Sequence, residues 1–293
     1  MDNAKNGMFM FKRDYMEYHA DRFTDHSLCI YKDNELFALL PACARDKEFL
    51  SHAGLTFGGI LSDTRMRTPH MLEIFDVLRE YLLAQQFTSC NYKAIPYIYT
   101  RYPAQEDLYA LFRAGAHASK CDVTSTICRA HLLNYSERRE RGIKKAQKAG
   151  LVFAKSTDFK QYFSLVGDIL QEKYQARPTH NAAEMLLLAS RFPENIALWT
   201  AQLSGKMVGG IIMYVSAQVA HAQYIAASPD GKEIGALDAL FDHLIAQVYI
   251  DKQYVDFGIS TEEGGRQLNT GLITQKEEFG ARAVVHQTFI WTL

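Results

Sequence analysis

Hydrophobic positions are spaced most regularly between residues 151 and 293. Residues 151–156, "LVFAKS", form a short β-rich run that predicts a strand. Residues 158–175 repeat apolar side chains at helical spacing behind Asp158, which is a favourable helix N-cap residue. Residues 181–192 repeat this pattern, and Asn181 and Glu184 have the spacing of a capping box. We therefore expect one strand followed by two helices.

The remainder of this half predicts strands with helices between them. Three β-rich runs, residues 196–203, 207–217 and 219–228, indicate a meander. Residues 234–250 carry apolar side chains in unbroken helical spacing, and Asp238 and Asp242 on this helix are expected to form a solvated face. A strand at 254–260, a helix ending near 280 and a strand at 283–293 complete the order β-α-α-β-β-β-α-β-α-β.

The first half has a similar but weaker pattern. It predicts strands around 28–42 and 54–61, a helix at 69–86, a strand at 90–96, a helix at 106–115 and a strand at 121–129. The last junctions of the two halves also correspond, because Gly115-Ala116-His117-Ala118 parallels Gly280-Ala281-Arg282-Ala283. Leu111 precedes Gly115 by four residues, as Lys276 precedes Gly280.

A basic segment joins the two halves. Residues 136–150, "SERRERGIKKAQKAG", place six Lys and Arg side chains among strong helix formers and end in a glycine suited to a helix C-terminus. Two interpretations stay open for this helix. It presents a solvated face, or it contacts a phosphate-rich ligand, since clustered cations attract phosphates even on a neutral protein.

Composition narrows the class of protein. Lys and Arg number 32 against 33 Asp and Glu, so the formal charge is -1 and no global field recruits nucleic acid. Five cysteines, all in the first half, show no CxxC pair or other metal-ligand spacing, which predicts free thiols in a reducing compartment and no metal site. Charges interrupt the N-terminal segment, and no window of about 18 apolar residues follows. We expect a cytoplasmic protein without a transmembrane segment.

The order of elements in the second half resembles the acyltransferase fold of the GNAT superfamily. Two such halves with a basic helix nearby resemble the FemAB-like transferases, including those of bacterial surface-polysaccharide and cell-wall biosynthesis. The resemblance implies an α+β (α/β) fold of two tandem GNAT-like (acyl-CoA N-acyltransferase) domains with mixed, mostly antiparallel sheets flanked by helices. The expected divisions are a degenerate N-terminal domain at 1–135, a basic linker helix at 136–150 and a C-terminal GNAT-like domain at 151–293.

The resemblance also implies a catalytic lysine. GNAT proteins resemble one another in a spaced pattern of Asn, a small or apolar residue, Tyr and Gly. In this sequence the corresponding positions hold Asn269, Leu272, Lys276 and Gly280, so that lysine replaces the tyrosine. That tyrosine lies near the sulfur of coenzyme A and protonates it as it leaves. Lys276 is accordingly predicted to protonate a leaving group or stabilise an oxyanion. The alternative is a surface lysine on an amphipathic helix.

Carboxylates near the same segment are candidates for removing a proton from an attacking amine. Asp256 lies inside a predicted strand, and Glu262 and Glu263 follow its carboxyl end, where two strands separate in the GNAT fold. For each glutamate, a solvated loop charge is the alternative. Gly264 and Gly265 are expected to allow positive φ in a sharp turn.

Donor and acceptor contacts follow from the same resemblance. The GNAT pyrophosphate loop is only partly matched by "KEIGAL", in which Leu237 obstructs the backbone approach. The predicted cofactor-binding residues for acetyl-CoA or another acyl-CoA are Ser228, Lys232, Gly235 and Asn269. The predicted acceptor contacts are Tyr174, Arg177, His180, Tyr224 and Glu263.

These observations predict an N-acyltransferase. It would transfer an acyl or aminoacyl group to an amine of a sugar nucleotide, a lipid-linked sugar or a cell-wall precursor. Two alternatives stay open: a FemAB-type transferase that uses aminoacyl-tRNA and binds tRNA through the basic helix at 138–148, and a catalytically degenerate GNAT pair that acts as a binding module. The sequence does not fix the oligomeric state.

Overall fold

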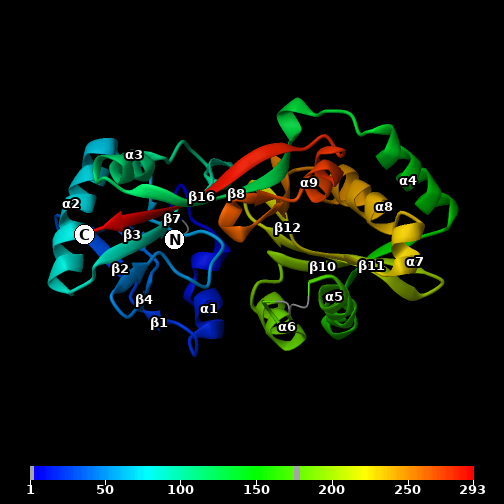
Figure 1. Ribbon diagram of the computed structural model, residues 1–293, viewed down its shortest axis with the longest axis horizontal. Coiled ribbons are helices and arrows are strands. Elements are labelled where there is room, and N and C mark those ends of the chain that lie inside the picture. The colour runs from blue at the N-terminus through cyan, green and yellow to red at the C-terminus, as the bar shows by residue number, and fades with distance from the viewer. Residues whose placement is uncertain (1–2, 175–178) are drawn as a thin grey trace. The chain divides into compact units, whose positions relative to one another are not determined.

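The chain folds into two compact units that are interleaved in sequence. The computed structural model describes residues 3–174 and 179–293, without the side chains of residues 168–174. Unit 1 comprises Met1–Val123, Thr261–Asn269 and Val284–Leu293. Unit 2 comprises Thr124–Ser260 and Thr270–Ala283. The strands β8 (His117–Cys128) and β16 (Arg282–Thr292) each contribute residues to both units (Figure 1).

Unit 1 contains a sheet of order β1-β4-β5-β7-β16 and a smaller sheet of order β2-β3-β6. In the larger sheet β5 and β7 are parallel, whereas β7 and β16 are antiparallel. The helices of the unit are α1 (Arg13–Met16), α2 (Thr68–Ala84) and α3 (Glu106–Arg113). Its strands are β1 (Thr24–Asp25), β2 (Leu28–Lys32), β3 (Glu35–Leu40), β4 (Cys43–Arg45), β5 (Glu48–Leu50), β6 (Leu61–Ser62), β7 (Ser89–Lys93), β14 (Thr261–Glu262) and β15 (Gln267–Leu268).

The core of unit 1 includes side chains from both ends of the chain. Phe49, Leu111 and Trp291 belong to one buried cluster. Leu111, at the position that parallels Lys276, has no exposed surface and is a core residue.

One strand prediction in this unit was wrong. Of residues 54–61 only Leu61 lies in a strand, while a Cβ at Gly58 would collide with the carbonyl oxygen of Ser51. The close backbone packing expected there is present without the strand. The hairpin of β4 and β5 was not predicted.

Unit 2 contains a sheet of order β8-β13-β12-β11-β10-β9. Figure 1 shows α4 and α8 on one face of this sheet and α5 and α6 on the other. The strands are β9 (Val152–Ser156), β10 (Ile196–Leu203), β11 (Lys206–Val215), β12 (Val219–Ala227) and β13 (Tyr254–Ile259). The helices are α4 (Glu137–Lys148), α5 (Phe159–Tyr174), α6 (Ala182–Arg191), α7 (Pro229–Glu233), α8 (Ala236–His243) and α9 (Thr270–Glu277), and a π-helical segment (Leu244–Val248) follows α8. The predicted order of elements is confirmed, with α7 as an additional short helix.

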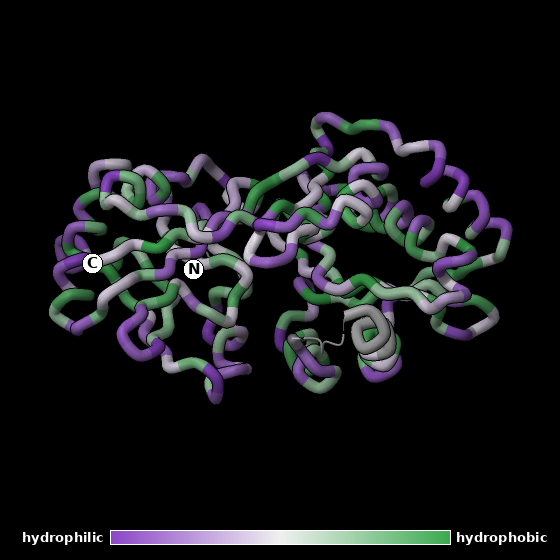
Figure 2. Tube along the Cα trace, in the orientation of Figure 1, coloured by the Kyte–Doolittle hydropathy of each residue, from purple (hydrophilic) through white to green (hydrophobic). Residues whose placement is uncertain are grey.

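Local capping explains why these helices begin where they do. The hydroxyl of Ser136 accepts a hydrogen bond from the backbone N–H of Arg139 at the start of α4. Asn181 and Glu184 form the predicted capping box, and Asp158 Oδ1 accepts from the backbone N–H of Gln161 at 2.8 Å. The basic segment is a helix of unit 2, and most of its residues are hydrophilic in Figure 2.

Candidate functional site

The candidate site lies where two parallel strands of unit 2 separate. β12 and β13 pair over three residue pairs, of which His221 and Asp256 are the last. Beyond this point β12 has a bulge, because successive pairs with β11 pass from Ala222 to Tyr224 and leave Gln223 as an extra residue. Bulges redirect side chains and often accompany active sites. The separation and the bulge together open the middle of the sheet.

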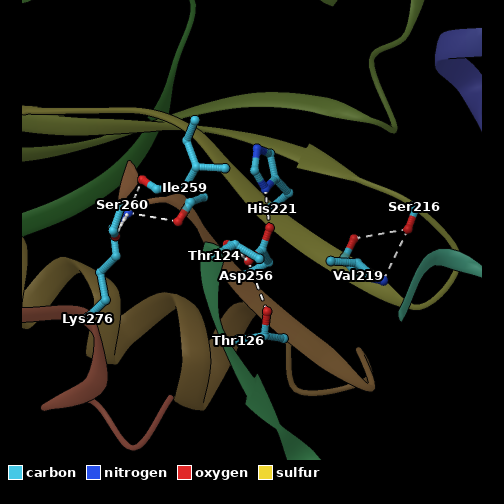
Figure 3. A network of polar contacts seen from close by, with 10 residues as sticks. Thr124, Thr126, Ser216, Val219, His221, Asp256, Ile259, Ser260 and Lys276 are labelled. Carbon is cyan, nitrogen blue, oxygen red and sulfur yellow. Dashed lines mark hydrogen bonds and ion pairs between the residues drawn. The ribbon is translucent and has the colours of Figure 1, made fainter. Parts of the chain in front are cut away.

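Lys276 of α9 is buried beside this opening. Its side chain is 6% exposed, and Nζ donates to the carbonyl oxygens of Gly258 at 2.8 Å and Ile259 at 2.7 Å. A third hydrogen bond of 2.9 Å reaches Oγ of Ser260 (Figure 3). Burial lowers the pKa of Lys276 to about 8, against a smaller opposing effect of Asp256. The alternative of a surface lysine was therefore wrong.

Asp256 of β13 pairs with His221, a residue that no sequence motif indicates. His221 Nδ1 lies 2.6 Å from Asp256 Oδ2. The other carboxylate oxygen accepts hydrogen bonds from the hydroxyls of Thr124 and Thr126, the latter at 3.0 Å (Figure 3). Asp256 has no exposed surface, whereas the His221 side chain is 14% exposed. A carboxylate enclosed in this way reaches an acceptor only through His221.

A cavity of about 610 Å³ in unit 2 adjoins Lys276. Phe241, Phe257 and Phe279 supply apolar walls. Cationic side chains also line it, and they come from α4, from α7 and from α9: Arg138, Arg139, Arg141, Lys145, Lys232 and Lys276. Two carboxylates, Glu233 and Asp238, also line the cavity, and the cations outnumber them. The cavity therefore has apolar walls and an excess of positive charge.

Two of the predicted cofactor-binding residues, Lys232 and Gly235, line this cavity, as does Leu237. Gly235 has φ 76°, and a Cβ there would lie 2.6 Å from the carbonyl oxygen of Gly142 in α4. This glycine is thus required for the packing of α4 on α8. The hydroxyl of Ser228 instead caps α7, since it accepts from the backbone N–H of Gly231 at 3.1 Å.

Arg139 joins α4 to the helices beside the cavity. Its guanidinium forms ion pairs with Asp238 and, at 3.0 Å, with Glu278, and it lies 4.9 Å from the ring centroid of Phe279. Burial raises the pKa of Asp238, and Arg139 partly offsets this rise. Burial likewise raises the pKa of Asp242, which a hydrogen bond from Tyr135 opposes. The solvated face expected for the two aspartates was wrong because α4 packs against α8.

Three predicted residues belong to unit 1, whereas Lys276 belongs to unit 2. They are Glu262, Glu263 and Asn269. The side-chain amide of Asn269 donates to Glu262 Oε1 at 3.1 Å, and both glutamates are exposed. Gly264 and Gly265 have φ of 65° and 88°, which confirms the predicted sharp turn.

The predicted acceptor residues include one contact pair. His180 Nδ1 lies 2.8 Å from the hydroxyl of Tyr224, which also accepts from the backbone N–H of His180 at 3.2 Å. Tyr174 is the last residue of α5, and its side chain lies outside the described residues. Arg177 also lies outside them.

Residues 3–174 and 179–293 contain no group of three or more His, Cys, Asp or Glu side chains placed to hold a metal ion. Within the same residues, no helix has the length and apolar character needed to span a bilayer. All five cysteines are free.

Comparison with known proteins identifies the fold. Residues 134–263 match the family model described as "Acetyltransferase (GNAT) domain". The structure is similar to that of FemX, with a TM-score of 0.71 and 11% sequence identity over 99% of this chain and 93% of the other. It is also similar to L-PGS from Bacillus licheniformis (TM-score 0.60, 8% identity, 94% of this chain and 90% of the other). A tandem GNAT protein from the clavulanic acid biosynthesis pathway gives 0.52 and 10% identity over 90% and 81%. No curated protein matches the sequence.

Proposed function

Because residues 134–263 match the GNAT acetyltransferase domain and the chain has the tandem GNAT fold of FemX-like proteins, we propose that it transfers an acyl or aminoacyl group to an amine. The single observation that carries this proposal is the cavity of unit 2, which has Lys276 and the strand opening on one side and basic side chains of α4 and α7 on another. A donor with phosphates and a reactive carbonyl fits these two sets of groups.

We propose acyl-coenzyme A as the donor. Its phosphates would contact Lys232 and the start of α8 at Gly235, and its pantetheine would follow the apolar wall of Phe241 and Phe257 toward Lys276. Helix N-termini favour anions, although the single glycine of this loop leaves fewer free backbone contacts than the usual GNAT motif.

Lys276 would act on the charge that develops during transfer. All three hydrogens of its ammonium group already have acceptors among Gly258, Ile259 and Ser260. Direct donation to an oxyanion therefore requires one of these bonds to be exchanged. Even without exchange, a buried positive charge stabilises a nearby developing negative charge, because the surroundings screen it weakly.

The acceptor is proposed to be the amine of a sugar nucleotide, a lipid-linked sugar or a cell-wall precursor. His180 and Tyr224 present ring nitrogens and a hydroxyl on the side of the sheet covered by α5 and α6. These groups suit a hydroxyl-rich acceptor, and Tyr174 and Arg177 remain proposed contacts.

Titration calorimetry with coenzyme A and acetyl-coenzyme A tests the donor. Lys232→Ala should weaken binding by about tenfold, which corresponds to one lost charge-assisted contact of about 1.4 kcal/mol. Lys206→Ala, at the first residue of β11, is the matched control because Lys206 does not line the cavity. Equal affinities for both variants and wild type would contradict donor binding at Lys232.

Aminoacyl-tRNA is the second candidate donor. It is favoured by the exposed cations of α4, since Arg138 and Arg141 are 64% and 72% exposed while lining the cavity. If tRNA binds, a triple variant of Arg138, Arg141 and Lys145 to Ala should bind more weakly and show a shallower salt dependence. The double variant Lys144→Ala/Lys148→Ala controls for charge on the same helix, because neither residue lines the cavity. Binding of either donor without product formation would support the degenerate binding module.

A further inference from the structure

The pair of His221 and Asp256 is built like a catalytic base with its orienting carboxylate. Asp256 Oδ1 is occupied by two threonine hydroxyls, which leaves Oδ2 for His221. An ionised carboxylate only accepts hydrogen bonds, so Nδ1 must carry the proton that it donates. In the neutral imidazole Nε2 is then the unprotonated nitrogen, and it has no hydrogen-bond partner within the described part of the chain.

The position of His221 in β12 determines which side of the sheet it faces. Its neighbours Ala220 and Ala222 pack with Leu240 and Phe241 of α8. Because side chains alternate along a strand, His221 faces the opposite side, which α5 and α6 cover. Tyr224 faces the same side after the bulge, where its ring lies 5.5 Å from that of Phe163 in α5.

Gly258 contacts His221 on one side and Lys276 on the other. Gly258 has φ 75° and lies next to His221, because a Cβ on it would be 3.5 Å from His221 Cε1. The carbonyl oxygen of the same glycine accepts from Lys276, which lines the cavity. One glycine thus lies between the imidazole and the ammonium group, without a side chain to cover the space between them.

We propose that His221, oriented by Asp256, is the base that removes the proton from the acceptor amine, and that the amine approaches from the α5 and α6 side. This inference rests on the proposed transfer function. The amine nitrogen forms a bond to the donor carbonyl carbon and loses a proton to Nε2. The bond from that carbon to the sulfur or oxygen of the leaving group breaks. The imidazolium proton then passes to that sulfur or oxygen. Nε2 of His221 is therefore unprotonated again after each turnover.

Variants of the full chain test the proposal. His221→Gln keeps a polar side chain of similar size, and kcat should fall by about 10²–10⁴-fold with little change in donor affinity. Asp256→Asn should also lower kcat, because an amide can donate to Nδ1 and favour the other tautomer. His243→Gln is the control, since His243 stacks on Phe153 on the other face and should leave kcat unchanged. In His221→Ala, added imidazoles should restore transfer in proportion to their basicity, which a purely structural role would not produce.

A second measurement does not depend on turnover. In ¹⁵N-histidine-labelled protein near pH 7.5, the signal that His221→Gln removes should be that of an imidazole protonated at Nδ1 only. The proposal would be overturned if wild type is active and His221→Gln keeps more than half of the wild-type kcat. If the wild-type protein transfers an acyl group from neither donor, the proposed transfer function is wrong. The NMR measurement then tests His221 independently, because protonation at Nε2 would overturn its assignment as the base.

Discussion

Two lysines, one in each unit, donate hydrogen bonds to backbone carbonyls. Lys93 of unit 1 donates to the carbonyl oxygens of Ala53 at 3.0 Å and Leu55 at 2.7 Å. Burial lowers the pKa of Lys93 and of Lys276 to about 8 in each case. The two residues share one structural role, while only Lys276 lies beside the strand opening, so Lys93 is a matched control for it.

Lys276→Met should reduce both stability and turnover. The substitution leaves buried carbonyl groups without a donor, which costs about 1–3 kcal/mol in the free energy of unfolding. Lys93→Met should cost a similar amount and leave turnover unchanged. Urea unfolding and a transfer assay of both variants measure this, and loss of stability without loss of turnover in Lys276→Met would make Lys276 a structural residue only.

The stability difference between wild type and Lys276→Met should depend on pH. The pKa of Lys276 falls from 10.5 when unfolded to about 8 when folded, so the unfolded chain binds its proton more tightly between these values. The cost of burying the charge is therefore fully present below about pH 8 and is relieved as pH rises toward 10.5. The free energy of unfolding of wild type should therefore exceed that of Lys276→Met by more at pH 9.5 than at pH 7.5. A difference that stays constant or shrinks would contradict the lowered pKa.

Gly280 and Gly115 form a second matched pair, because each follows the last helix before a final strand. Both have left-handed φ, 80° and 77°. A Cβ at Gly280 would lie 2.6 Å from the carbonyl oxygen of Leu133, whereas at Gly115 it would meet nothing within 4 Å. Gly115→Ala should cost about 1–2 kcal/mol for the backbone conformation alone, and Gly280→Ala about 1–3 kcal/mol more for the collision. Equal midpoints of thermal unfolding would contradict this.

At the level of elements, the cation Arg139 stabilises the packing of α4 on α8. Arg139 is 7% exposed and pairs with Asp238 and Glu278, so Arg139→Met leaves Asp238 without its ion-pair partner and Glu278 with only Arg138, at 3.8 Å. Removing one member of a buried ion pair costs about 3–5 kcal/mol. Arg141→Met, which breaks only an exposed pair with Glu137, should cost less than about 0.5 kcal/mol.

The defect of Arg139→Met should shrink in acid. The pKa of Asp238 is already raised by burial, and loss of Arg139 removes the effect that opposes the rise. A carboxyl with a raised folded pKa destabilises the fold above that pKa and ceases to do so once it is protonated. The difference in unfolding free energy between wild type and Arg139→Met should therefore be smaller at pH 5 than at pH 7.5. A difference independent of pH would contradict the role given to Asp238.

Helices and their ends could be predicted because their causes are local. Ser136, Asp158 and Asn181 cap the helices that follow them within three residues. The pair of His221 and Asp256 could not be predicted in this way. The two residues come from different strands, β12 and β13, and meet only when these strands pair in parallel. The available signal was a polar residue inside each of two adjacent β-rich runs, "VAHAQY" and "YVDFG". Asp238 was misinterpreted for the same reason, because its partner lies on another helix.

At the level of the whole molecule, the units divide the chain at positions that composition does not mark. Ser260 belongs to unit 2 and Thr261 to unit 1, although both lie in one polar stretch after β13. The spacing from Asn269 to Gly280 predicts one motif, yet Asn269 belongs to unit 1 and Lys276 to unit 2. Sequence spacing sets the register along a chain, but it does not determine which core each residue joins.

The interleaved units predict how fragments behave. Residues 1–135 contain the predicted N-terminal domain but lack Val284–Leu293, which supplies most of β16, the strand paired with β7. Trp291 of this segment is 1% exposed, and its ring lies 5.3 Å from that of Phe75. Losing a buried tryptophan alone costs about 3–5 kcal/mol, a large share of the stability of a domain. We expect the fragment 1–135 to lack a cooperative unfolding transition in circular dichroism.

Joining residues 284–293 to this fragment through a flexible linker should restore the transition, because β16 then pairs with β7 again. A linker followed by the same ten residues with Trp291→Ala is the control, and it should restore less. Cooperative unfolding of residues 1–135 alone, at a midpoint near that of the full chain, would mean that β16 is dispensable for unit 1. The boundary near residue 135 would then describe an independent domain, and the pairing of β16 with β7 would contribute little to its core.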